Sequence, residues 1–409
     1  MKVLYIHQYF SIPTQAGGTR SYEMARRLVE RGHQVTMVCG EDDDNSLHLP
    51  ATEKKGVFRG NVDGIDVIQI SIPYSNNMGL VARTKSFCRF AWQSVRFAMK
   101  EDFDVLFATS TPLTAGIPGI VMKMFRRKKK FIFEVRDLWP ELPKALGMKN
   151  PFFLCAMNIL EWLSYHTADG CIGLSPGICE GIKRRSQKNK PIAMVPNGCD
   201  LDIFNPSLRG PLELDGINSD DKVAVFTGAH GVANGLDAVL DMAKALQGKG
   251  RKDIKIAFIG SGKMKAHLQE RVKSEGIDNC LFYNPIPKMQ LAKIVASATV
   301  GLMVLKNVPA FYYGTSPNKF FDYIASGLPI INNYPGWLSD LIHENNCGVV
   351  VEPDNAQAFA DALLDMVDNA PLQEYSKNAR KLAETSFDRN LLGNQFADFF
   401  EQVCNHNAI

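Results

Sequence analysis

The sequence predicts an α/β protein made of two doubly wound domains, each a parallel sheet covered by helices on both faces. Apolar, strand-like runs alternate with amphipathic helical stretches along almost all of its 409 residues, and the turns between them are short and contain Gly or Pro. With 45% apolar and 22% charged residues, the chain is long enough for two separate cores. This composition excludes disordered, collagen-like and disulfide-scaffold proteins.

The first half contains five apolar runs that we expect to be parallel strands, with the amphipathic stretch YEMARRLVERG between the first two. The runs are VLYIHQYF, QVTMVC, DVLFATS, KFIFEV and GCIGLS. The charge-free stretch from Val105 to Met122 contains two prolines and two glycines. It therefore predicts a strand, a loop and a helix start, with Thr111 as N-cap and Pro112 in the first turn, in preference to a membrane span.

The alternation restarts after residue 190. The expected strands are AMVPNG, VAVFTG, KIAFIG, CLFYNPI, VGLMVL, PIINN and GVVVEP, and the expected helices are 234–248, 263–275, 287–297, 317–326, 336–344 and one from 355. The polar, basic stretch KRRSQKNK before Pro191 predicts a linker. We thus expect an N-terminal domain 1–190, a C-terminal domain 191–385, and a last helix 386–409 that crosses back to the first domain.

The cysteines point to a reducing compartment. Nine occur without a CxxC or Cys/His ligand spacing, and the first residues, MKVLYIHQYF, have the pattern of a buried strand in place of a signal peptide. We expect a cytoplasmic protein without a metal site.

The net charge of +3 conceals an asymmetry. Residues 1–190 carry 27 basic and 18 acidic side chains, whereas the remainder carries 19 and 25. Two segments of the first half are candidates for membrane contact, because each Lys or Arg near an anionic bilayer contributes about 1 kcal/mol. Their basic residues are Lys85, Arg89, Arg96 and Lys100 in one helical stretch, and Arg126, Arg127, Lys128, Lys129 and Lys130 in the run MKMFRRKKK. A solvated helix face is the alternative; nucleic-acid binding is not expected, since nothing else resembles a nucleic-acid fold.

Ligands of open α/β sheets bind beyond the carboxyl ends of the strands, so the strand-to-helix turns are the candidate sites. The first such turn carries Gly17 and Gly18 before a helix, where free N–H groups attract anions. Neither G-x-G-x-x-G nor GxxxxGK[ST] occurs in the chain, which disfavours dinucleotide and P-loop sites.

The segment GTSPNKFFDYIASGLP, residues 314–329, is the most informative. Ser316 is a good N-cap and Pro317 a good first helical residue, so a helix should begin here and end at Gly327. The amides of Thr315, Ser316 and Asn318 with Lys319 would bind a diphosphate, and Asp322, one turn later, would accept hydrogen bonds from ribose. A capped helix with a surface Lys/Asp pair is the alternative.

Several segments together resemble the retaining glycosyltransferases of family 4, which have the GT-B fold. They are the Gly17-Gly18 loop, VRDLWPE, ADG before Ser175, VPNGCD leading to Phe204, FTG, FIGSG and SPNKFFDYIASGLP. The resemblance implies two Rossmann-like domains facing across a cleft, with a nucleotide-sugar donor on the second and an acceptor on the first. Among family members it is most similar to bacterial enzymes of O-antigen and capsule assembly, such as L-FucNAc transferases.

The chain departs from the family pattern at its charged positions. The family's paired glutamates would fall on Gly314 and Asp322, and its Arg and Lys after the first strand of the second domain would fall near Ala229 and Asn234. We therefore expect Lys319 and the helix amides to carry the leaving-group charge, helped by His230 and by a donor loop that includes Gly228 and Asn234. Arg136 and Asp137 stand where the family often has His-Asp, and complete the expected catalytic set of Lys319, Asp137 and Arg136.

The predicted activity is retaining, metal-independent and cofactor-free transfer of an N-acetylated hexosamine. The donor would be UDP-linked, and the acceptor an undecaprenyl-diphosphate-linked glycan of surface polysaccharide at the inner face of the plasma membrane. Retention would follow a same-face route that needs no enzyme nucleophile, distinct from double displacement by two carboxylates. A nucleotide-sugar 2-epimerase and a non-catalytic scaffold related to these enzymes are the alternatives.

Overall fold

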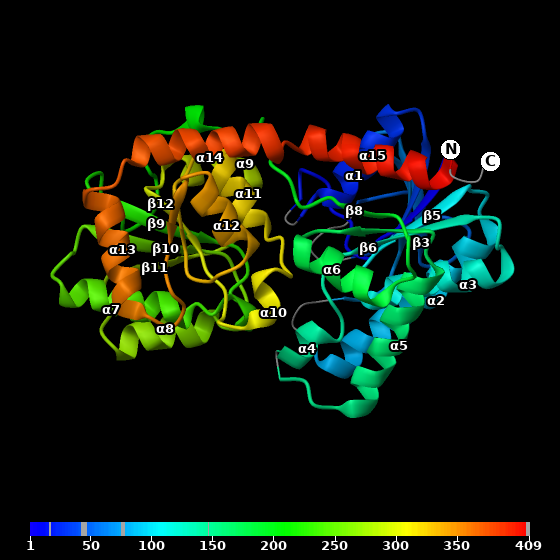
Figure 1. Ribbon diagram of the computed structural model, residues 1–409, viewed down its shortest axis with the longest axis horizontal. Coiled ribbons are helices and arrows are strands. Elements are labelled where there is room, and N and C mark those ends of the chain that lie inside the picture. Colours follow the sequence, from blue (N-terminus) through cyan, green and yellow to red (C-terminus); the bar gives the residue numbers. More distant parts are fainter. Residues whose placement is uncertain (16–17, 42–46, 75–77, 146, 406–409) are drawn as a thin grey trace. The chain divides into compact units, whose positions relative to one another are not determined.

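The computed structural model describes residues 1–15, 18–41, 47–74, 78–145 and 147–405 (Figure 1). The chain divides into two compact units. Unit 1 comprises Met1–Pro196, Gly314–Ser316 and Asn390–Ile409, and unit 2 comprises Asn197–Tyr313 and Pro317–Arg389. Each unit has a predominantly parallel sheet between helices, so the predicted fold class is confirmed.

Unit 1 contains an eight-stranded sheet of order β3-β4-β2-β1-β5-β6-β7-β8. The strands are β1 (Lys2–Ile6), β2 (Gln34–Gly40), β3 (Val57–Val62), β4 (Ile65–Ile70), β5 (Val105–Thr109), β6 (Lys130–Val135), β7 (Gly170–Gly173) and β8 (Ile192–Met194). All pairs are parallel except the edge hairpin β3–β4, which turns at Asp63 and Gly64, both at positive φ. We did not predict this hairpin, because the alternating pattern alone favoured an all-parallel sheet.

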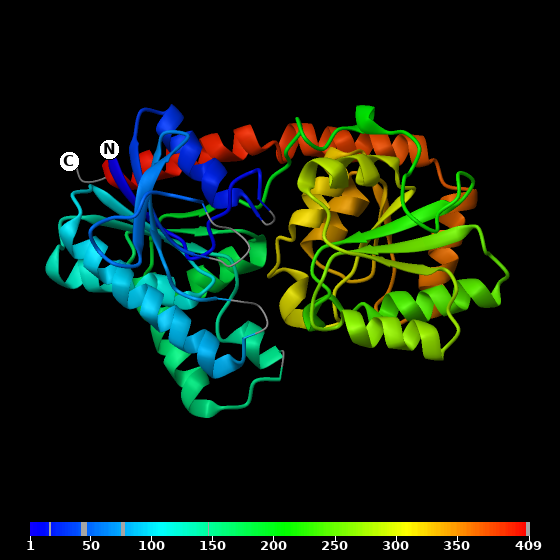
Figure 2. The ribbon, with the colours of Figure 1, turned by 180° about the vertical axis from the view of Figure 1, so that it is seen from behind.

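The helices of unit 1 form two layers, one on each face of the sheet. They are α1 (Arg20–Glu30), α2 (Leu80–Lys100), the 3-10 turn η1 (Leu113–Gly116), α3 (Ile117–Phe125), α4 (Glu141–Ala145), α5 (Pro151–Thr167), α6 (Pro176–Arg185) and α15 (Arg389–Asn405). Along one face α3 packs against α2 and α5, and α5 packs against α6. Figures 1 and 2 show α1 and α15 on the opposite face. This is the arrangement that right-handed crossovers produce when the chain moves first toward one edge and then toward the other.

The C-terminal helix α15 belongs to unit 1. The rings of Phe396 and Phe400 lie 5.3 and 5.1 Å from that of Phe107 on β5. Arg31 at the end of α1 pairs with Asp398 at 2.7 Å. The last helix therefore returns to the first domain, as expected from its apolar spacing.

Unit 2 has a six-stranded, fully parallel sheet of order β11-β10-β9-β12-β13-β14. Its strands are β9 (Lys222–Thr227), β10 (Ile254–Ile259), β11 (Cys280–Tyr283), β12 (Val300–Met303), β13 (Ile330–Asn332) and β14 (Gly348–Val350). Its helices and 3-10 turns are η2 (Pro206–Leu208), η3 (Val232–Asn234), α7 (Asp237–Gly248), α8 (Lys265–Ser274), α9 (Lys288–Ser297), α10 (Pro309–Tyr312), α11 (Asn318–Ala325), α12 (Trp337–Glu344), α13 (Ala356–Asp368) and α14 (Leu372–Ser386). The core lies between β9, β10 and β12 and the helices α7 and α13.

Two details of the sequence prediction were wrong. The boundary between the units lies after Pro196 and not after Lys190, because Ile192–Met194 forms β8 and pairs with β7 of unit 1. Thr111 caps no helix: its φ is 81°, and Pro112 precedes the 3-10 turn η1.

The described residues include no helix long and apolar enough to cross a membrane. Within the same residues, no group of three or more His, Cys, Asp or Glu side chains could hold a metal ion. All nine cysteines are free thiols.

Candidate functional site

In unit 2 the loop that follows β9 meets the first turn of α11. Gly228 directly follows the strand with φ 119°, a conformation that favours glycine, and a Cβ at this position would lie 3.5 Å from Lys319 Cε. Asn234 closes the same loop: its Nδ2 donates to the Ala229 carbonyl at 2.7 Å, and its Oδ1 accepts from Lys319 Nζ at 3.2 Å. The structure thus brings together Gly228, Asn234 and Lys319, all predicted to bind the donor.

Lys319 is a half-buried cation without a carboxylate partner among the described residues. Its Nζ lies 3.8 Å from the ring centroid of Phe226 on β9, within the range of a cation–π contact. Burial lowers the pKa of Lys319 to about 7. Within the described chain, the polar and aromatic contacts of this half-buried ammonium are an amide oxygen and a ring face, and such a cation is suited to bind an anion.

His230, on the same loop, is buried with an exposed fraction of 0%. Its ring contacts those of Phe226, Phe258 and Phe282, one from each of β9, β10 and β11. Neither ring nitrogen has a hydrogen-bond partner among the residues that the structure describes. Burial, with smaller contributions from Lys265 and Lys319, lowers the pKa of His230 to about 4, so the imidazole is neutral at pH 7.

Asp322 lies one turn after Lys319 but has different neighbours. The charged groups that act on it are Lys288, Asp200 and Arg389, and Arg389 pairs with Asp200 at 2.8 Å. Burial raises the pKa of Asp322 to about 7. No hydrogen bond or ion pair joins Asp322 to Lys319 in the described part of the chain, so the surface Lys/Asp pair considered above does not form.

The start of α11 differs from the prediction. The helix begins at Asn318, with Pro317 as its N-cap residue and no side-chain cap, so the assignment of Ser316 as N-cap was wrong. Pro317 has φ −72° and ψ 130°, which is extended and not helical. Thr315 and Ser316 are half-buried in the segment before the helix, and Asn318 is exposed at its first position.

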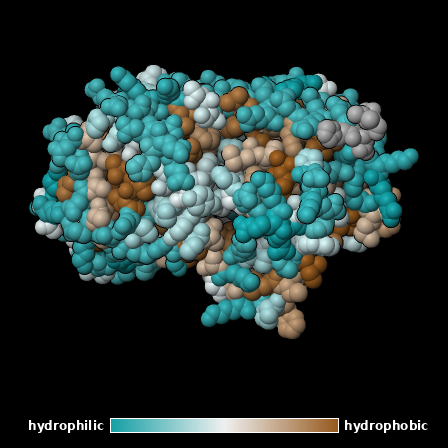
Figure 3. Space-filling model, in the orientation of Figure 1, coloured by the Kyte–Doolittle hydropathy of each residue, from teal (hydrophilic) through white to brown (hydrophobic). Residues whose placement is uncertain are grey.

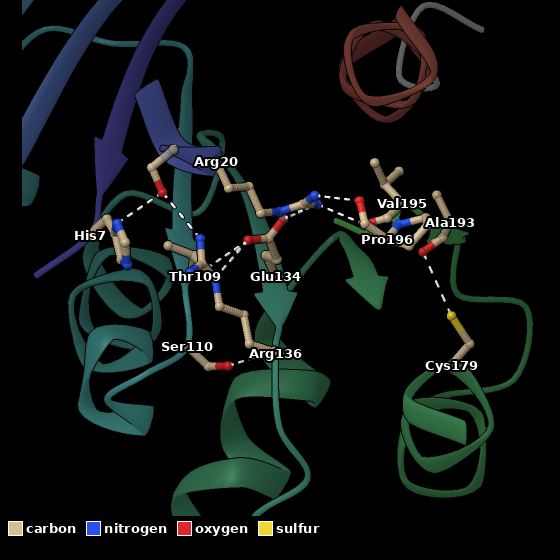
Figure 4. A network of polar contacts seen from close by, with 11 residues as sticks. His7, Arg20, Thr109, Ser110, Glu134, Arg136, Cys179, Ala193, Val195 and Pro196 are labelled. Carbon is tan, nitrogen blue, oxygen red and sulfur yellow. Dashed lines mark hydrogen bonds and ion pairs between the residues drawn. The ribbon is translucent and has the colours of Figure 1, made fainter. Parts of the chain in front are cut away.

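In unit 1 a buried ion-pair network lies at the carboxyl edge of the sheet (Figure 4). Glu134 on β6 has no exposed surface and accepts from Arg20 Nη2 at 2.7 Å and from Thr109 Oγ1 at 2.7 Å. Arg136 Nε donates to Thr109 Oγ1 at 2.9 Å and lies 3.3 Å from Glu134. Burial opposes the ionisation of Glu134, but Arg20 and Arg136 outweigh it and keep its pKa below the usual range.

Arg20 also donates to the carbonyls of Val195 and Pro196, at 2.7 and 2.6 Å. It thereby fixes the last residues of unit 1 before the chain enters unit 2. Arg136, which we predicted as catalytic, also donates from Nη2 to Ser21 Oγ at 3.2 Å, and Ser21 Oγ lies 2.8 Å from His7 Nδ1. The guanidinium of Arg136 is therefore hydrogen-bonded within this network.

Asp137 follows Arg136 at the end of β6 and is half-buried. Thr111 Oγ1 donates to its Oδ2 at 3.2 Å. Burial raises the pKa of Asp137, and the Thr111 hydrogen bond and the Arg136 charge oppose this rise. Thr111 itself is a β-branched residue at φ 81°, a strained conformation of the kind that concentrates at functional sites.

The glycine loop before α1 is only partly described. Gly18 is exposed and precedes Thr19 and the helix, whereas Gly17 lies outside the described residues. The structure therefore adds nothing to the prediction for Gly17.

The predicted membrane-contact residues fall into two groups. Lys85, Arg89, Arg96 and Lys100 are exposed on α2, and Arg127 and Lys128 are exposed in the turn after α3. Arg126, in contrast, donates to the carbonyls of Ala98 and Glu101 at 3.0 and 2.9 Å. Lys129 lies 5.8 Å from the Phe103 ring, and Lys130 begins β6. These three residues are half-buried, so the basic turn presents fewer free charges than the sequence suggested.

Three functional candidates were missed. Two of them are Arg20 and Glu134, whose pairing could not be predicted because they lie 114 residues apart in the chain. The glutamate within the apolar run KFIFEV did, however, indicate a buried charge. Lys265 joins the ends of two strands by donating to the carbonyls of Gly260 and Tyr283, at 3.1 and 2.9 Å. No local pattern marks that role.

The two halves of the chain match two protein-family models. Residues 17–203 match Glycosyltransferase Family 4, and residues 214–382 match Glycosyl transferases group 1. Among curated proteins, the chain is 27% identical over 194 residues to the D-inositol 3-phosphate glycosyltransferase of Paenarthrobacter aurescens, covering 45% of each protein. It spans about half the length of that relative.

A second relative matches over a longer stretch. It is the N-acetylgalactosamine-N,N'-diacetylbacillosaminyl-diphospho-undecaprenol 4-alpha-N-acetylgalactosaminyltransferase of Campylobacter jejuni, 24% identical over 284 residues, which cover 66% of this chain and 69% of that protein.

Two solved structures show the same fold over nearly the whole chain. The sucrose-phosphate synthase of Thermosynechococcus elongatus superposes with a TM-score of 0.76 at 17% identity, covering 98% of both chains. Anabaena Alr3699/HepE in complex with UDP superposes with a TM-score of 0.69 at 14% identity, covering 98% of this chain and 100% of that one.

Proposed function

The chain is a member of the GT-B glycosyltransferases, and from this premise we propose that it transfers an N-acetylated hexosamine, such as L-FucNAc, from a UDP-linked donor to a lipid-linked oligosaccharide of bacterial surface polysaccharide. The observation that carries the proposal is the position of Lys319. Its ammonium lies against the β9 loop, at the carboxyl edge of a parallel sheet where this architecture binds nucleotides.

Lys319 is proposed to stabilise the departing diphosphate. Negative charge develops on the diphosphate as the glycosidic bond breaks, and a cation already fixed in a poorly solvated position stabilises that charge without reorganising. Because the Lys319 pKa is about 7 in the free protein, an arriving diphosphate would raise it and keep the ammonium protonated.

A uridine nucleotide is proposed as the donor carrier. The similar Alr3699/HepE structure contains UDP, and further structures of that protein contain UDP with glucose and UDP-glucose. In this chain Asp322 would accept hydrogen bonds from the ribose hydroxyls. A carboxyl group with a pKa of about 7 is present in both protonation states near neutrality, and either state bonds to a hydroxyl group.

The acceptor is assigned to the carboxyl edge of the unit 1 sheet, near Asp137. Tyr9, Tyr74 and Phe87 form an aromatic cluster there, with ring centroids 4.8 Å apart for Tyr9 and Tyr74 and 5.8 Å apart for Tyr74 and Phe87. Thr114 in η1, three residues after the Thr111 that bonds to Asp137, donates a hydrogen bond to the Phe87 carbonyl at 3.4 Å. Aromatic faces and a carboxylate are the groups that bind sugar rings and hydroxyls. The name of the Campylobacter jejuni relative includes a diphospho-undecaprenol acceptor, which supports a lipid-linked acceptor here.

We propose retention of configuration without an enzyme nucleophile. The departing diphosphate oxygen would accept the proton of the incoming acceptor hydroxyl on the same face of the sugar. In this scheme Lys319 and the site backbone supply charge stabilisation and orientation, and Arg136 holds the strand end that carries Asp137. We propose no metal or cofactor for the step.

Neither of the alternative functions, a nucleotide-sugar 2-epimerase or a non-catalytic scaffold, is favoured. Both matched families are glycosyltransferases and the curated relatives quoted above are named as transferases, so an epimerase lacks support. A non-catalytic scaffold would not need a half-buried lysine without a carboxylate partner among the described residues at the proposed diphosphate site.

Calorimetric titration of the whole chain with UDP, GDP and dTDP tests the donor assignment directly. We expect UDP to bind and to raise the melting temperature, because a ligand that binds only the folded state stabilises it by mass action. Loss of UDP binding in Lys319→Met, with binding retained in the exposed-lysine control Lys377→Met on α14, would place the nucleotide at this site. A chain that binds none of the three nucleotides would refute the proposal.

A further inference from the structure

The outer face of the helix layer α2, α3 and α5 in unit 1 exposes large apolar side chains. Of the thirteen exposed large hydrophobic residues in the described part of the chain, eight lie on these three helices. They are Val81, Trp92, Met99, Met124, Phe125, Phe152, Ile159 and Trp162. Figure 3 shows brown and tan side chains gathered over the lobe that contains α5. A cluster of this kind on a soluble surface marks a site of protein or membrane interaction.

Helix α5 contributes an apolar stripe. Phe152, Cys155, Ile159 and Trp162 follow one another at spacings of three, four and three residues, and therefore lie along one side of the helix. Phe152 is 86% exposed and Trp162 is 45% exposed. The opposite side of α5 is buried through Met157, Ser164 and Tyr165. The stripe is thus the outer face of a helix that is already packed on its sheet.

Helix α2 contributes a stripe that contains both basic and apolar residues. Lys85, Arg89, Trp92, Arg96 and Met99 recur at helical spacing, and all five are exposed. The end of α3 lies between the two stripes and exposes Phe125 to 70%, next to the exposed Arg127 and Lys128. Because α3 packs against both α2 and α5, the three helices present a single surface.

The exposed charges on the three helices themselves have one sign. Neither α2 nor α3 contains an acidic residue. Glu161, the one acidic residue in the sequence of α5, is buried and pairs with Arg185 at 3.0 Å. The surface is therefore apolar and positively charged, which is complementary to an anionic lipid bilayer.

We propose that the outer face of α2, α3 and α5 inserts into the headgroup region of an anionic bilayer, with Phe125, Phe152 and Trp162 as apolar anchors. The basic residues of α2 and of the 127–128 turn contact lipid phosphates. This inference rests on the proposed function, since it brings the protein to the surface that holds a lipid-linked acceptor. The sequence alone predicted a contact through basic residues, whereas the proposed membrane contact is made mainly by the apolar stripe of α5.

A second copy of the chain fits this face poorly. A symmetric dimer places the same patch on both subunits, so the basic stripes of α2 would lie opposite each other with no acidic residue on α2 or α3 to compensate. An anionic bilayer carries the opposite charge, so no such repulsion between like charges arises.

Sedimentation of the purified chain with vesicles tests the proposal. We expect binding to phosphatidylglycerol-containing vesicles and weak binding to pure phosphatidylcholine. The double variant F125S/F152S should lower the partition coefficient roughly 100-fold, about tenfold for each buried phenyl ring lost. The variant R127Q/K128Q should lower it about fivefold per charge, and only on anionic vesicles.

Matched controls lie in unit 2. Met289 is 63% exposed on α9, so M289S removes an apolar group of similar exposure, and K377Q/K381Q removes two exposed charges from α14. Both control variants should bind vesicles as the wild type does. Equal losses in the controls, or unchanged binding in F125S/F152S, would overturn the proposal, as would a dimer in ultracentrifugation that F125S/F152S abolishes.

Tryptophan fluorescence gives an independent measure of insertion. Trp92 and Trp162 lie on the proposed face, so vesicles should shift the emission to the blue, brominated lipid should quench it, and W92F/W162F should remove most of both effects. UDP binding, measured in the same preparations, separates the two hypotheses. Intact UDP binding without vesicle binding would refute the membrane face alone, and vesicle binding without UDP binding would refute the donor site alone.

Discussion

Lys319 Nζ lies 3.2 Å from Asn234 Oδ1, and through this contact the first turn of α11 supplies a cation to the loop after β9. In the family that the chain resembles, that loop carries its own Arg and Lys. Here we expect those positions to fall near Ala229 and Asn234, neither of which is basic, and Asn234 accepts a hydrogen bond from Lys319. Under the proposed function, Lys319 would supply the positive charge at this strand end.

Replacing Lys319 should impair chemistry more than folding. Lys319→Met keeps the length and apolar stem of the side chain but removes the charge, and we expect kcat to fall by roughly 10², as for the loss of a single charge-stabilising donor. Lys319→Arg should retain more activity than Lys319→Met. Lys377→Met, an exposed change on α14, serves as the control, and unchanged turnover in Lys319→Met would remove Lys319 from the mechanism.

The depressed pKa of Lys319 predicts a pH dependence of stability. The unfolded lysine keeps its proton up to about pH 10.4. The folded one loses it near pH 7. Between these values the unfolded state binds more protons, so this group makes the free protein more stable as pH rises from 7 to 10. Asp322, with its pKa raised to about 7, acts with the opposite sign and below pH 7, so the two windows do not overlap.

Melting temperatures measured from pH 7 to 10 can isolate the Lys319 contribution. The stability of the wild type relative to Lys319→Met should increase across this range when no nucleotide is present. Saturating UDP should abolish the increase, because a bound diphosphate keeps the lysine protonated. A wild-type curve parallel to that of Lys319→Met without UDP would contradict the assignment.

Asp322 is predicted to bind the ribose of the donor, and this role can be tested with a modified nucleotide. The wild type should bind UDP more tightly than 2'-deoxy-UDP, and Asp322→Asn should reduce that preference while affecting 2'-deoxy-UDP little. Asp340→Asn, on α12 of the same unit, is a suitable control. An unchanged preference in Asp322→Asn would show that the carboxyl group does not contact the 2'-hydroxyl.

The fold of both units could be predicted from the sequence because apolar alternation and glycine-containing turns are local signals. The environment of the site residues could not. Asp322 and Lys319 are three residues apart on α11, but the charged groups that act on Asp322 belong to distant parts of the sequence. They are Asp200, Lys288 and Arg389. Similarly, β8 was assigned to the second domain because its three residues do not reveal that they pair with β7.

Glu134→Gln should destabilise unit 1. The substitution keeps the shape of the side chain but leaves Arg20 and Arg136 without the carboxylate between them, and removing one partner of a buried ion pair costs about 3 kcal/mol of unfolding free energy. Chemical denaturation would measure this loss. Glu180→Gln removes an exposed pair with Lys183 on α6 and should leave the unfolding free energy nearly unchanged, because solvent screens the pair. Comparable losses in both variants would argue against the buried network as a stabilising element.

His230 offers a test in which stability and binding change in opposite directions. Both of its ring nitrogens are buried without hydrogen-bond partners in the described part of the chain, and an unsatisfied buried polar group costs about 1–3 kcal/mol. His230→Phe replaces the imidazole among three phenyl rings with an apolar ring, so the free protein should melt at a higher temperature. If the imidazole bonds to the nucleotide, the same variant should bind UDP more weakly. His343→Phe on α12 changes an exposed histidine and should produce neither effect. A gain in stability with unchanged UDP affinity would mean that His230 plays no part in donor binding, whereas the opposed changes would identify a residue kept for the ligand at a cost to the fold.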